Sequence, residues 1–371
     1  MKVLILSCNT GGGHNSAANA IAEEIHAQGH EAYVLDYLSL AGKKVSKIVG
    51  EGYIQIVKKT PLLFGLVYKL GMVISRLTRK SPVYYINGHM AKYLNKYLKE
   101  HPADVLVMPH LYPAETVTYM KRKGMNLPLT IAVMTDYTCI PFWEETDCDH
   151  YILPHEALRK SCVKRGIPNE KIQTFGIPVA KKCRLEISKE KARETLGLEQ
   201  DQKYFLTAGG SMGAGDFMEL IQKLVAGTET ERILAICGNN HKTERKLKKK
   251  FKDEPRVSVL GFTDQMPLYL SACDVVFTKP GGLTSTEAAV IKVPMIHTAP
   301  IPGCETINRR FFMRAGMSWS AITLKGQVNK GIRLMNDPAA QKKMKIHQAK
   351  QIHGDAVEKL YRFICSQCNT K

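Results

Sequence analysis

The chain has 371 residues, a length that predicts two domains because single hydrophobic cores seldom serve chains this long. Its 44% hydrophobic content and mixed charges exclude an intrinsically disordered protein, and its net charge of +19 favours an anionic partner such as nucleic acid, an anionic membrane or a phosphorylated substrate. No apolar run reaches the ~18 residues of a membrane-spanning helix. The first residues, MKVLILSCNTGGG, predict a buried strand and not a signal peptide. We therefore expect an intracellular protein whose membrane contact is peripheral.

The first half of the chain alternates short apolar runs with amphipathic stretches, which is typical of a parallel sheet covered by helices. The predicted strands are residues 3–7, 32–36, 105–108, 131–134, 151–153 and 172–175. The spacing of Ala17, Ala20, Ile21 and Ile25 predicts a helix over residues 16–28.

The segment between the second and third of these strands, residues 42–100, differs from the rest in charge. It holds twelve Lys or Arg residues and two acidic ones, which gives +10 of the total +19. Such a basic segment, interleaved with aliphatic and aromatic residues, favours the headgroup plane of an anionic bilayer. The basic residues expected at that surface are Lys43, Lys47, Lys58 and Lys59. The alternatives are a pair of core helices with a solvated basic face, and a nucleic-acid surface, for which no recognition motif is present.

A charged segment, residues 181–202, precedes a second series of predicted strands. These strands are residues 204–207, 233–237, 257–260, 275–278 and 295–297, and residues 338–367 are predicted to be helical throughout. We therefore expect two Rossmann-like domains, residues 1–180 and 181–354, and a final helix within residues 355–371 that packs back on the first domain.

Four loops follow predicted strands, at the edge of the sheet where open α/β proteins bind ligands. The first, residues 9–16, reads NTGGGHNS, and its glycines allow backbone amides to approach a phosphate. His14 follows these glycines directly, near the start of a helix. A positive charge is disfavoured there, so we expect a neutral imidazole that can accept a proton. The alternative is a histidine that caps or packs locally.

The other three loops lie in the second half of the chain. Residues 208–216, AGGSMGAGD, form a phosphate cradle without the Gly-Lys-Ser/Thr ending of an ATPase loop. In residues 279–287, KPGGLTSTE, we expect Glu287 to lie in the first turn of a helix and to bind the two hydroxyls of a ribose, the alternative being a Glu that offsets the helix dipole. The fourth loop, residues 300–308, presents Glu305 and Asn308 to sugar hydroxyls. We expect a nucleotide on the second domain, facing an acceptor and a base on the first.

Taken in order, these motifs resemble the monogalactosyldiacylglycerol synthase and processive diacylglycerol glucosyltransferase family over nearly the whole chain. The residues that carry the resemblance are GGGH at 11–14, TD at 135–136, GIPV at 176–179, GGSMG at 209–213, KPGGLT at 279–284 with Glu287, and PG at 302–303 with Glu305 and Asn308. The family is related to the peptidoglycan N-acetylglucosaminyltransferase. The resemblance implies the α/β architecture called GT-B, in which two Rossmann-like domains face a central cleft.

The resemblance also implies roles for particular residues. His14 would be the catalytic base, and Asp136 would line the acceptor site and compete for that role. The acceptor side would further include Gly12, Gly13 and His110. The donor side would consist of Gly210, Ser211, Met212 and Gly213 at the diphosphate, Phe262 at the uracil, Gly281, Gly282, Leu283, Thr284 and Glu287 at the ribose loop, and Glu305 and Asn308 at the sugar. The chain departs from the family at Cys304, where an amide side chain is common.

The expected reaction is an inverting transfer of glucose or galactose from a UDP-sugar to diacylglycerol or a glycosyldiacylglycerol. We expect the sequence to have no Asp-x-Asp pair that could hold a divalent ion across the diphosphate, so we predict neither a metal nor another cofactor. The expected partners are the UDP-sugar, the lipid and an anionic membrane, with no nucleic acid, at the inner face of the cell membrane. The alternatives are a transferase for a polyprenyl-linked or peptidoglycan acceptor, a two-domain UDP-sugar epimerase, and a non-enzymatic binding module.

Overall fold

A computed structural model describes most of the chain, in two compact units. The described residues are 1–9, 12–42, 44, 46, 48, 52, 61–78, 80–209 and 217–368. Unit 1 comprises Met1–Lys181, Pro302–Cys304 and Gly354–Lys371, and unit 2 comprises Lys182–Ile301 and Glu305–His353. Within the described part of the chain, no helix combines the length and the apolar character needed to cross a bilayer.

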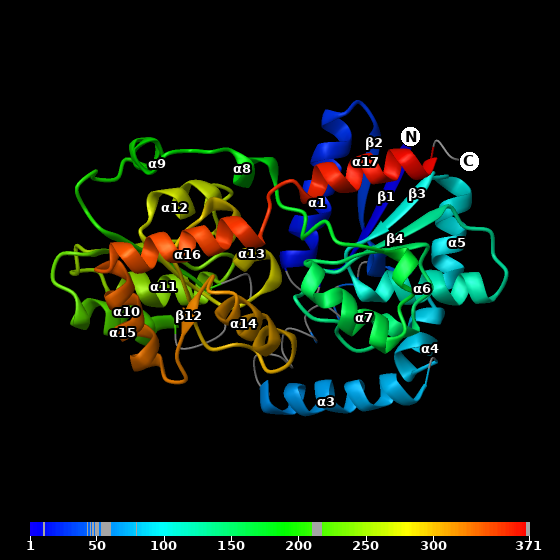
Figure 1. The fold of residues 1–371 in the computed structure, drawn as a ribbon, viewed down its shortest axis with the longest axis horizontal. Coiled ribbons are helices and arrows are strands. Elements are labelled where there is room, and N and C mark those ends of the chain that lie inside the picture. The colour runs from blue at the N-terminus through cyan, green and yellow to red at the C-terminus, as the bar shows by residue number, and fades with distance from the viewer. Residues whose placement is uncertain are drawn as a thin grey trace. The chain divides into compact units, whose positions relative to one another are not determined.

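Unit 1 is built on a parallel sheet of six strands in the order β2-β1-β3-β4-β5-β6 (Figure 1). The strands are β1 (Lys2–Ser7), β2 (Glu31–Asp36), β3 (Val105–Met108), β4 (Leu129–Val133), β5 (His150–Ile152) and β6 (Ile172–Gln173). The central strands are continuous apolar runs buried on both faces, as parallel sheets covered by helices require. Val3 pairs with Ala32 on one side and with Val105 on the other, which fixes the register of the first three strands.

Helices cover both faces of this sheet. The helices of the described part of unit 1 are α1 (Gly12–Ala27), α3 (Pro61–Leu77), α4 (Pro82–Gly88), α5 (Ala91–Glu100), α6 (Leu111–Arg122), α7 (Arg159–Arg165) and α17 (Ala356–Cys368). One core joins Val3 and Ile5 of β1 to Ile21 of α1 and Leu360 of α17. A second core, on the opposite face, contains Leu94 of α5 together with residues of α6 (Figure 1).

Unit 2 repeats the plan, with a parallel sheet in the order β12-β11-β10-β7-β8-β9. Its strands are β7 (Tyr204–Ala208), β8 (Arg232–Ile236), β9 (Val257–Leu260), β10 (Val275–Thr278), β11 (Met295–His297) and β12 (Trp319–Ser320). The helices of this part of the chain are α8 (Lys181–Arg184), α9 (Lys189–Leu196), α10 (Phe217–Gly227), α11 (His241–Lys250), α12 (Met266–Ala272), α13 (Gly282–Ile291), α14 (Cys304–Arg314), α15 (Leu324–Met335) and α16 (Pro338–Gln351). Gly331 allows α15 to approach the sheet closely, because a Cβ there would lie 2.1 Å from the Phe277 ring.

The two parallel sheets confirm the predicted α/β class, while two local predictions were wrong and one strand was missed. Helix α1 begins at Gly12, four residues before the predicted start at residue 16. The stretch 338–367 is not one helix, because Ile352 has an extended backbone and Gly354, a poor helix former, follows it before α17 begins. Strand β12 was not predicted, since two residues carry no periodic signal.

Candidate functional site

The candidate site of unit 1 lies where its strand order reverses direction. Strand β1 has β2 on one side and β3 on the other, so the chain leaves the carboxyl ends of β1 and β3 toward opposite faces of the sheet. Ligands of open α/β sheets bind at such a position. His14 follows β1, His110 follows β3, and Asp136 follows β4, so three of the predicted residues come from adjacent strand ends.

His14 is held by groups from two other loops. Its Nδ1 lies 2.8 Å from the Pro109 carbonyl oxygen and 3.0 Å from Thr135 Oγ1. A carbonyl oxygen only accepts hydrogen bonds, so Nδ1 carries the proton and Nε2 keeps its lone pair. Burial lowers the pKa of His14, against the opposing effects of the Asp136 carboxylate and the Pro109 carbonyl. The ring is therefore neutral at pH 7, with Nε2 able to accept a proton.

His110 stands beside His14 in the opposite tautomer. It is the N-cap of α6, and its Nδ1 accepts a hydrogen bond of 3.1 Å from the Tyr112 amide. Its Nε2 therefore carries the proton. The two imidazoles meet edge to face with centroids 4.5 Å apart, and burial together with His14 lowers the pKa of His110. Both rings are thus neutral: His14 offers an acceptor nitrogen, and His110 offers an N–H donor.

Gly12 and Gly13 form the first turn of α1, directly before His14. Both are partly exposed, as is Asp136, so the backbone and the carboxylate remain accessible. The histidine contacts Pro109 and Thr135 on neighbouring loops, so the alternative of a purely local cap does not describe it.

In unit 2 the strand order reverses between β7 and β10, and two of the glycine-containing loops begin there. A cavity of about 130 Å³ opens at these strand ends and is lined by Gly209, Lys279 and Thr298, among others. Gln327 is almost fully buried in its wall, and its Oε1 has no hydrogen-bond partner among the described residues. The predicted diphosphate residues Gly210, Ser211, Met212 and Gly213 lie outside the described residues.

Helix α13 follows β10 and carries the predicted ribose loop. Gly281 is its N-cap, and Gly282, Leu283 and Thr284 form its first turn. Glu287 lies in the second turn and not in the first, because the helix begins five residues before it, which corrects the prediction and removes the alternative of a capping carboxylate. Burial raises the pKa of Glu287 to about 7, and the nearby Lys182 opposes this effect.

The remaining donor-side residues differ in exposure. Phe262 is 69% exposed. Glu305 Oε2 accepts a 2.6 Å hydrogen bond from the Ile301 amide, which folds the loop over the start of α14. Asn308 is fully buried, and its amide donates to the Pro280 carbonyl at 3.1 Å. Asn308 therefore joins the loops that follow β10 and β11.

One expectation about acidic residues needs correction. The chain does contain an Asp-x-Asp sequence, at Asp147 and Asp149. Both carboxylates form ion pairs within unit 1, Asp147 with Lys171 at 2.8 Å and Asp149 with Lys121 at 2.5 Å. Among the described residues, no three His, Cys, Asp or Glu side chains are placed to hold a metal.

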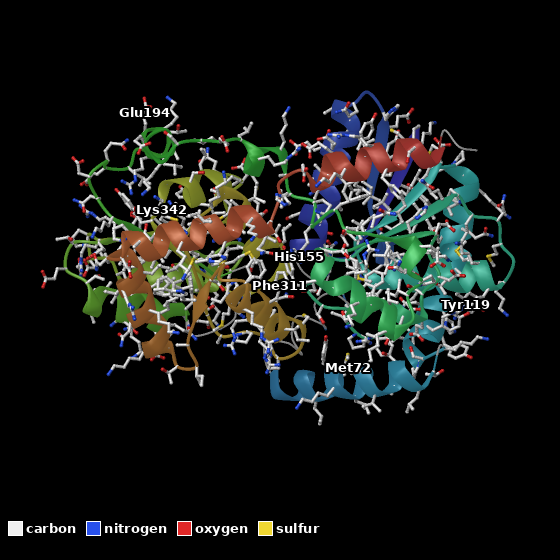
Figure 2. All side chains as sticks on the ribbon, in the orientation of Figure 1. Met72, Tyr119, His155, Glu194, Phe311 and Lys342 are labelled. Carbon is white, nitrogen blue, oxygen red and sulfur yellow. The ribbon has the colours of Figure 1, made fainter. Side chains whose placement is uncertain are left out.

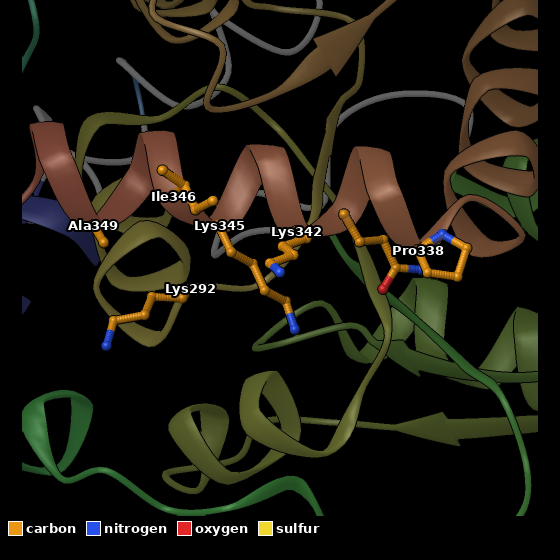
Figure 3. Close-up of a pocket in the computed structure, with 7 residues that line it drawn as sticks. Lys292, Pro338, Lys342, Lys345, Ile346 and Ala349 are labelled. Atoms are coloured by element: carbon orange, nitrogen blue, oxygen red, sulfur yellow. The ribbon is translucent and has the colours of Figure 1, made fainter.

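A second hollow in unit 2, of about 430 Å³, contains none of the predicted donor residues (Figure 3). Lys292, which ends α13, and Lys342 and Lys345 of α16 supply its charged walls. Sequence reasoning did not find this hollow, because the two helices meet only in the folded chain. The predicted membrane residues Lys43, Lys47, Lys58 and Lys59 lie outside the described residues.

Sequence reasoning also missed the groups that orient His14. Pro109 and Thr135 are 95 and 121 residues away from it in the chain. Thr135 was noted only as part of a motif, and no local pattern relates either residue to the histidine.

Two family models match the chain, one in each half. Residues 14–179 match monogalactosyldiacylglycerol (MGDG) synthase, and residues 205–360 match the glycosyltransferase family 28 C-terminal domain. A processive diacylglycerol beta-glucosyltransferase of Staphylococcus saprophyticus is 28% identical over 341 residues, which are 91% of this chain and 85% of that protein. One of the same name from Bacillus pumilus is 27% identical over 84% of this chain and 80% of its own length.

Solved structures share the fold at lower identity. MurG of Acinetobacter baumannii superposes with a TM-score of 0.65 at 16% identity and covers 98% of this chain and 99% of its own. MnaA of Staphylococcus aureus, solved with UDP, gives a TM-score of 0.66 at 12% identity, with 99% and 97% of the two chains covered. These likenesses confirm the predicted GT-B fold.

Proposed function

We propose that this chain, a glycosyltransferase of the GT-B fold, transfers a hexose from a UDP-sugar to diacylglycerol or a glycosyldiacylglycerol. Its first half matches monogalactosyldiacylglycerol synthase, and its second half matches the family 28 C-terminal domain. The curated relatives named as processive diacylglycerol beta-glucosyltransferases support this acceptor. The observation that carries the proposal is the neutral His14, whose Nδ1 is bound to the Pro109 carbonyl and whose Nε2 is left to accept a proton.

In the proposed reaction, His14 Nε2 takes the proton of the lipid hydroxyl as its oxygen attacks the anomeric carbon. The bond from that carbon to the diphosphate breaks on the opposite face, UDP leaves, and the configuration inverts. A positioned base of this kind contributes roughly 10²–10⁴-fold to the rate. Asp136 is the competing base, and its carboxylate also raises the pKa of His14 and so helps the ring to hold the proton.

The donor would bind at the strand ends of unit 2. Backbone amides at the start of α13 and the positive end of its dipole suit the negative charge that gathers on UDP. We propose that this stabilisation replaces a metal, and that no other cofactor takes part. Glu287, whose pKa burial raises to about 7, lies one turn further along the same helix and would meet the ribose there.

We place the reaction at a membrane surface because of helix α3. Its exposed apolar residues lie along one side of the helix and are Leu66, Val67, Leu70, Val73 and Leu77. Covering one such side chain stabilises by about 1.5–3 kcal/mol. The alternative of a core helix fits α5, whose Leu94 is fully buried, but not α3. We propose that this surface docks on the anionic inner face of the cell membrane.

The test is an assay with UDP-glucose or UDP-galactose and three acceptor conditions: diacylglycerol in vesicles, a polyprenyl phosphate lipid, and no lipid. We expect UDP release and a glycolipid of inverted anomeric configuration with diacylglycerol only, and no transfer by His14→Ala. The fold is shared with UDP-N-acetylglucosamine 2-epimerases, for example that of Neisseria meningitidis. Turnover of UDP-N-acetylglucosamine without lipid, or transfer only to the polyprenyl lipid, would reject the proposal.

A further inference from the structure

Helix α3 contains a tyrosine whose hydroxyl is buried without a partner. Tyr68 Oη is inaccessible to solvent, and no described residue forms a hydrogen bond with it. Leaving a buried donor unsatisfied costs about 1–3 kcal/mol. A phenylalanine would fill the same space without that cost, so the hydroxyl is a candidate donor for a bound ligand.

Helix α3 packs on the loop that carries Asp136, because a Cβ at Gly71, one turn beyond Tyr68, would lie 3.4 Å from the Phe142 ring. Burial raises the pKa of Tyr68 well above its ordinary value, and the Cys304 thiol and the Asp136 carboxylate act in the same direction. Tyr68 therefore keeps its proton and can act as a hydrogen-bond donor. The segment Pro302–Cys304 closes over the ring, because a Cβ at Gly303 would lie 3.0 Å from Tyr68.

The position of Tyr68 is fixed by the way α3 is held. Arg165 of α7 donates to Met72 Sδ at 3.2 Å and to Ser75 Oγ at 2.9 Å, both one or two turns further along α3. Figure 2 labels Met72 on this helix. The same guanidinium donates to the Cys139 carbonyl at 2.9 Å, in the loop that carries Asp136. Arg165 thus ties the inner side of α3 to the loop of the candidate acceptor site.

Helix α3 therefore has two different sides. Leu66, Leu70 and Leu77 point to the exterior, whereas Tyr68 and Ser75 point inward to unit 1. A lipid whose chains lie against the outer side would have its polar end near the inner side, which carries Tyr68. The glycerol region of such a lipid carries hydroxyl, ester and glycosidic oxygens, all of which accept hydrogen bonds.

We propose that Tyr68 is an acceptor-binding residue, whose hydroxyl donates a hydrogen bond to an oxygen of the glycerolipid acceptor beside Asp136. This inference rests on the proposed function and adds to it the group that holds the lipid end of the reaction. The donor sugar has no part in the contact.

The test is steady-state kinetics of Tyr68→Phe with diacylglycerol in vesicles and UDP-glucose or UDP-galactose. We expect kcat/KM for the lipid to fall roughly tenfold, the size of one lost hydrogen bond, while KM for the donor is unchanged. The melting temperature should stay the same or rise, because the substitution removes an unsatisfied donor. Tyr85→Phe, at an exposed ring of α4, is the matched control and should change neither parameter.

The outcomes separate the two proposals. Absence of any glycolipid with the unmodified protein would reject the proposed function, and the inference with it. If the unmodified protein transfers the sugar and Tyr68→Phe has the same kcat/KM for the lipid, the role of Tyr68 is rejected while the proposed function stands. A lower melting temperature with equal losses toward donor and lipid would show a structural role and overturn the inference as well.

Discussion

His14 owes its protonation state to its neighbours. The Pro109 carbonyl fixes the tautomer, burial lowers the pKa, and the Asp136 carboxylate raises it. The direction of the shift is the one expected for a histidine near a helix N-terminus, but burial is its main cause. A base with a lowered pKa is free of its proton throughout the neutral range, at the cost of some basicity.

This balance predicts the pH dependence of transfer. If His14 is the base, the rate falls only when the ring is protonated, so the acid limb should lie below pH 6.5, the ordinary pKa of the group. Asp136→Asn removes a charge that raises the pKa, so the midpoint should move to still lower pH. NMR titration of the His14 ring in both proteins measures the midpoints without relying on activity. A midpoint at or above pH 6.5, or no change in Asp136→Asn, would contradict the assignment.

The residues of the site differ in how far sequence predicts them. His14 was predictable because it adjoins three glycines in one loop. Pro109 and Thr135 were not, because their contacts with it form only when three strand ends come together. Tyr68 has the same difficulty, since in sequence it is one aromatic residue in a largely apolar segment. What distinguishes it is a buried hydroxyl with no partner in the described part of the chain.

At the scale of elements, α3 is the feature that sequence described least completely. The basic and apolar composition of residues 42–100 predicted an interfacial segment but not which side of a helix faces outward. In the structure, Arg165 holds the inner side and leaves the leucines of the outer side uncovered by the described residues. The strands, by contrast, were predictable as continuous apolar runs, because both of their faces are buried.

The exposed side of α3 predicts a specific loss of membrane binding. Replacing Leu66, Leu70 and Leu77 together by Ser should weaken binding to anionic vesicles by roughly tenfold or more, because their apolar area no longer leaves water. The melting temperature should change little, since these side chains are already exposed. Vesicle sedimentation measures the affinity.

Ile346→Ser, at an exposed residue of α16, is the control and should bind vesicles like the unmodified protein. If the triple variant bound anionic vesicles at low salt as tightly as the unmodified protein does, α3 would not dock on the bilayer.

At the scale of the molecule, the two units have separate cores, and the C-terminal segment of the chain belongs to unit 1. After α16 in unit 2, residues 352–355 lead to α17, which packs on α1 of unit 1. The sequence predicted helix through this passage because the helical pattern hardly changes across it. The break follows from a tertiary requirement, since α17 must bury Val357, Leu360 and Ile364 against the first sheet.

Separate cores predict separable stabilities. Leu360 is fully buried in unit 1, so Leu360→Ala should cost about 2–5 kcal/mol there without altering UDP affinity, because the proposed donor site lies wholly in unit 2. Scanning calorimetry with and without UDP measures the two effects separately. The nucleotide should raise the transition temperature of unit 2, and Leu360→Ala should lower the transition temperature of unit 1. Leu334→Ala, at an equally buried leucine of α15, should instead lower the transition that UDP raises. If both variants lowered the same UDP-sensitive transition, the two units would unfold as one, and donor binding would depend on the packing of α17.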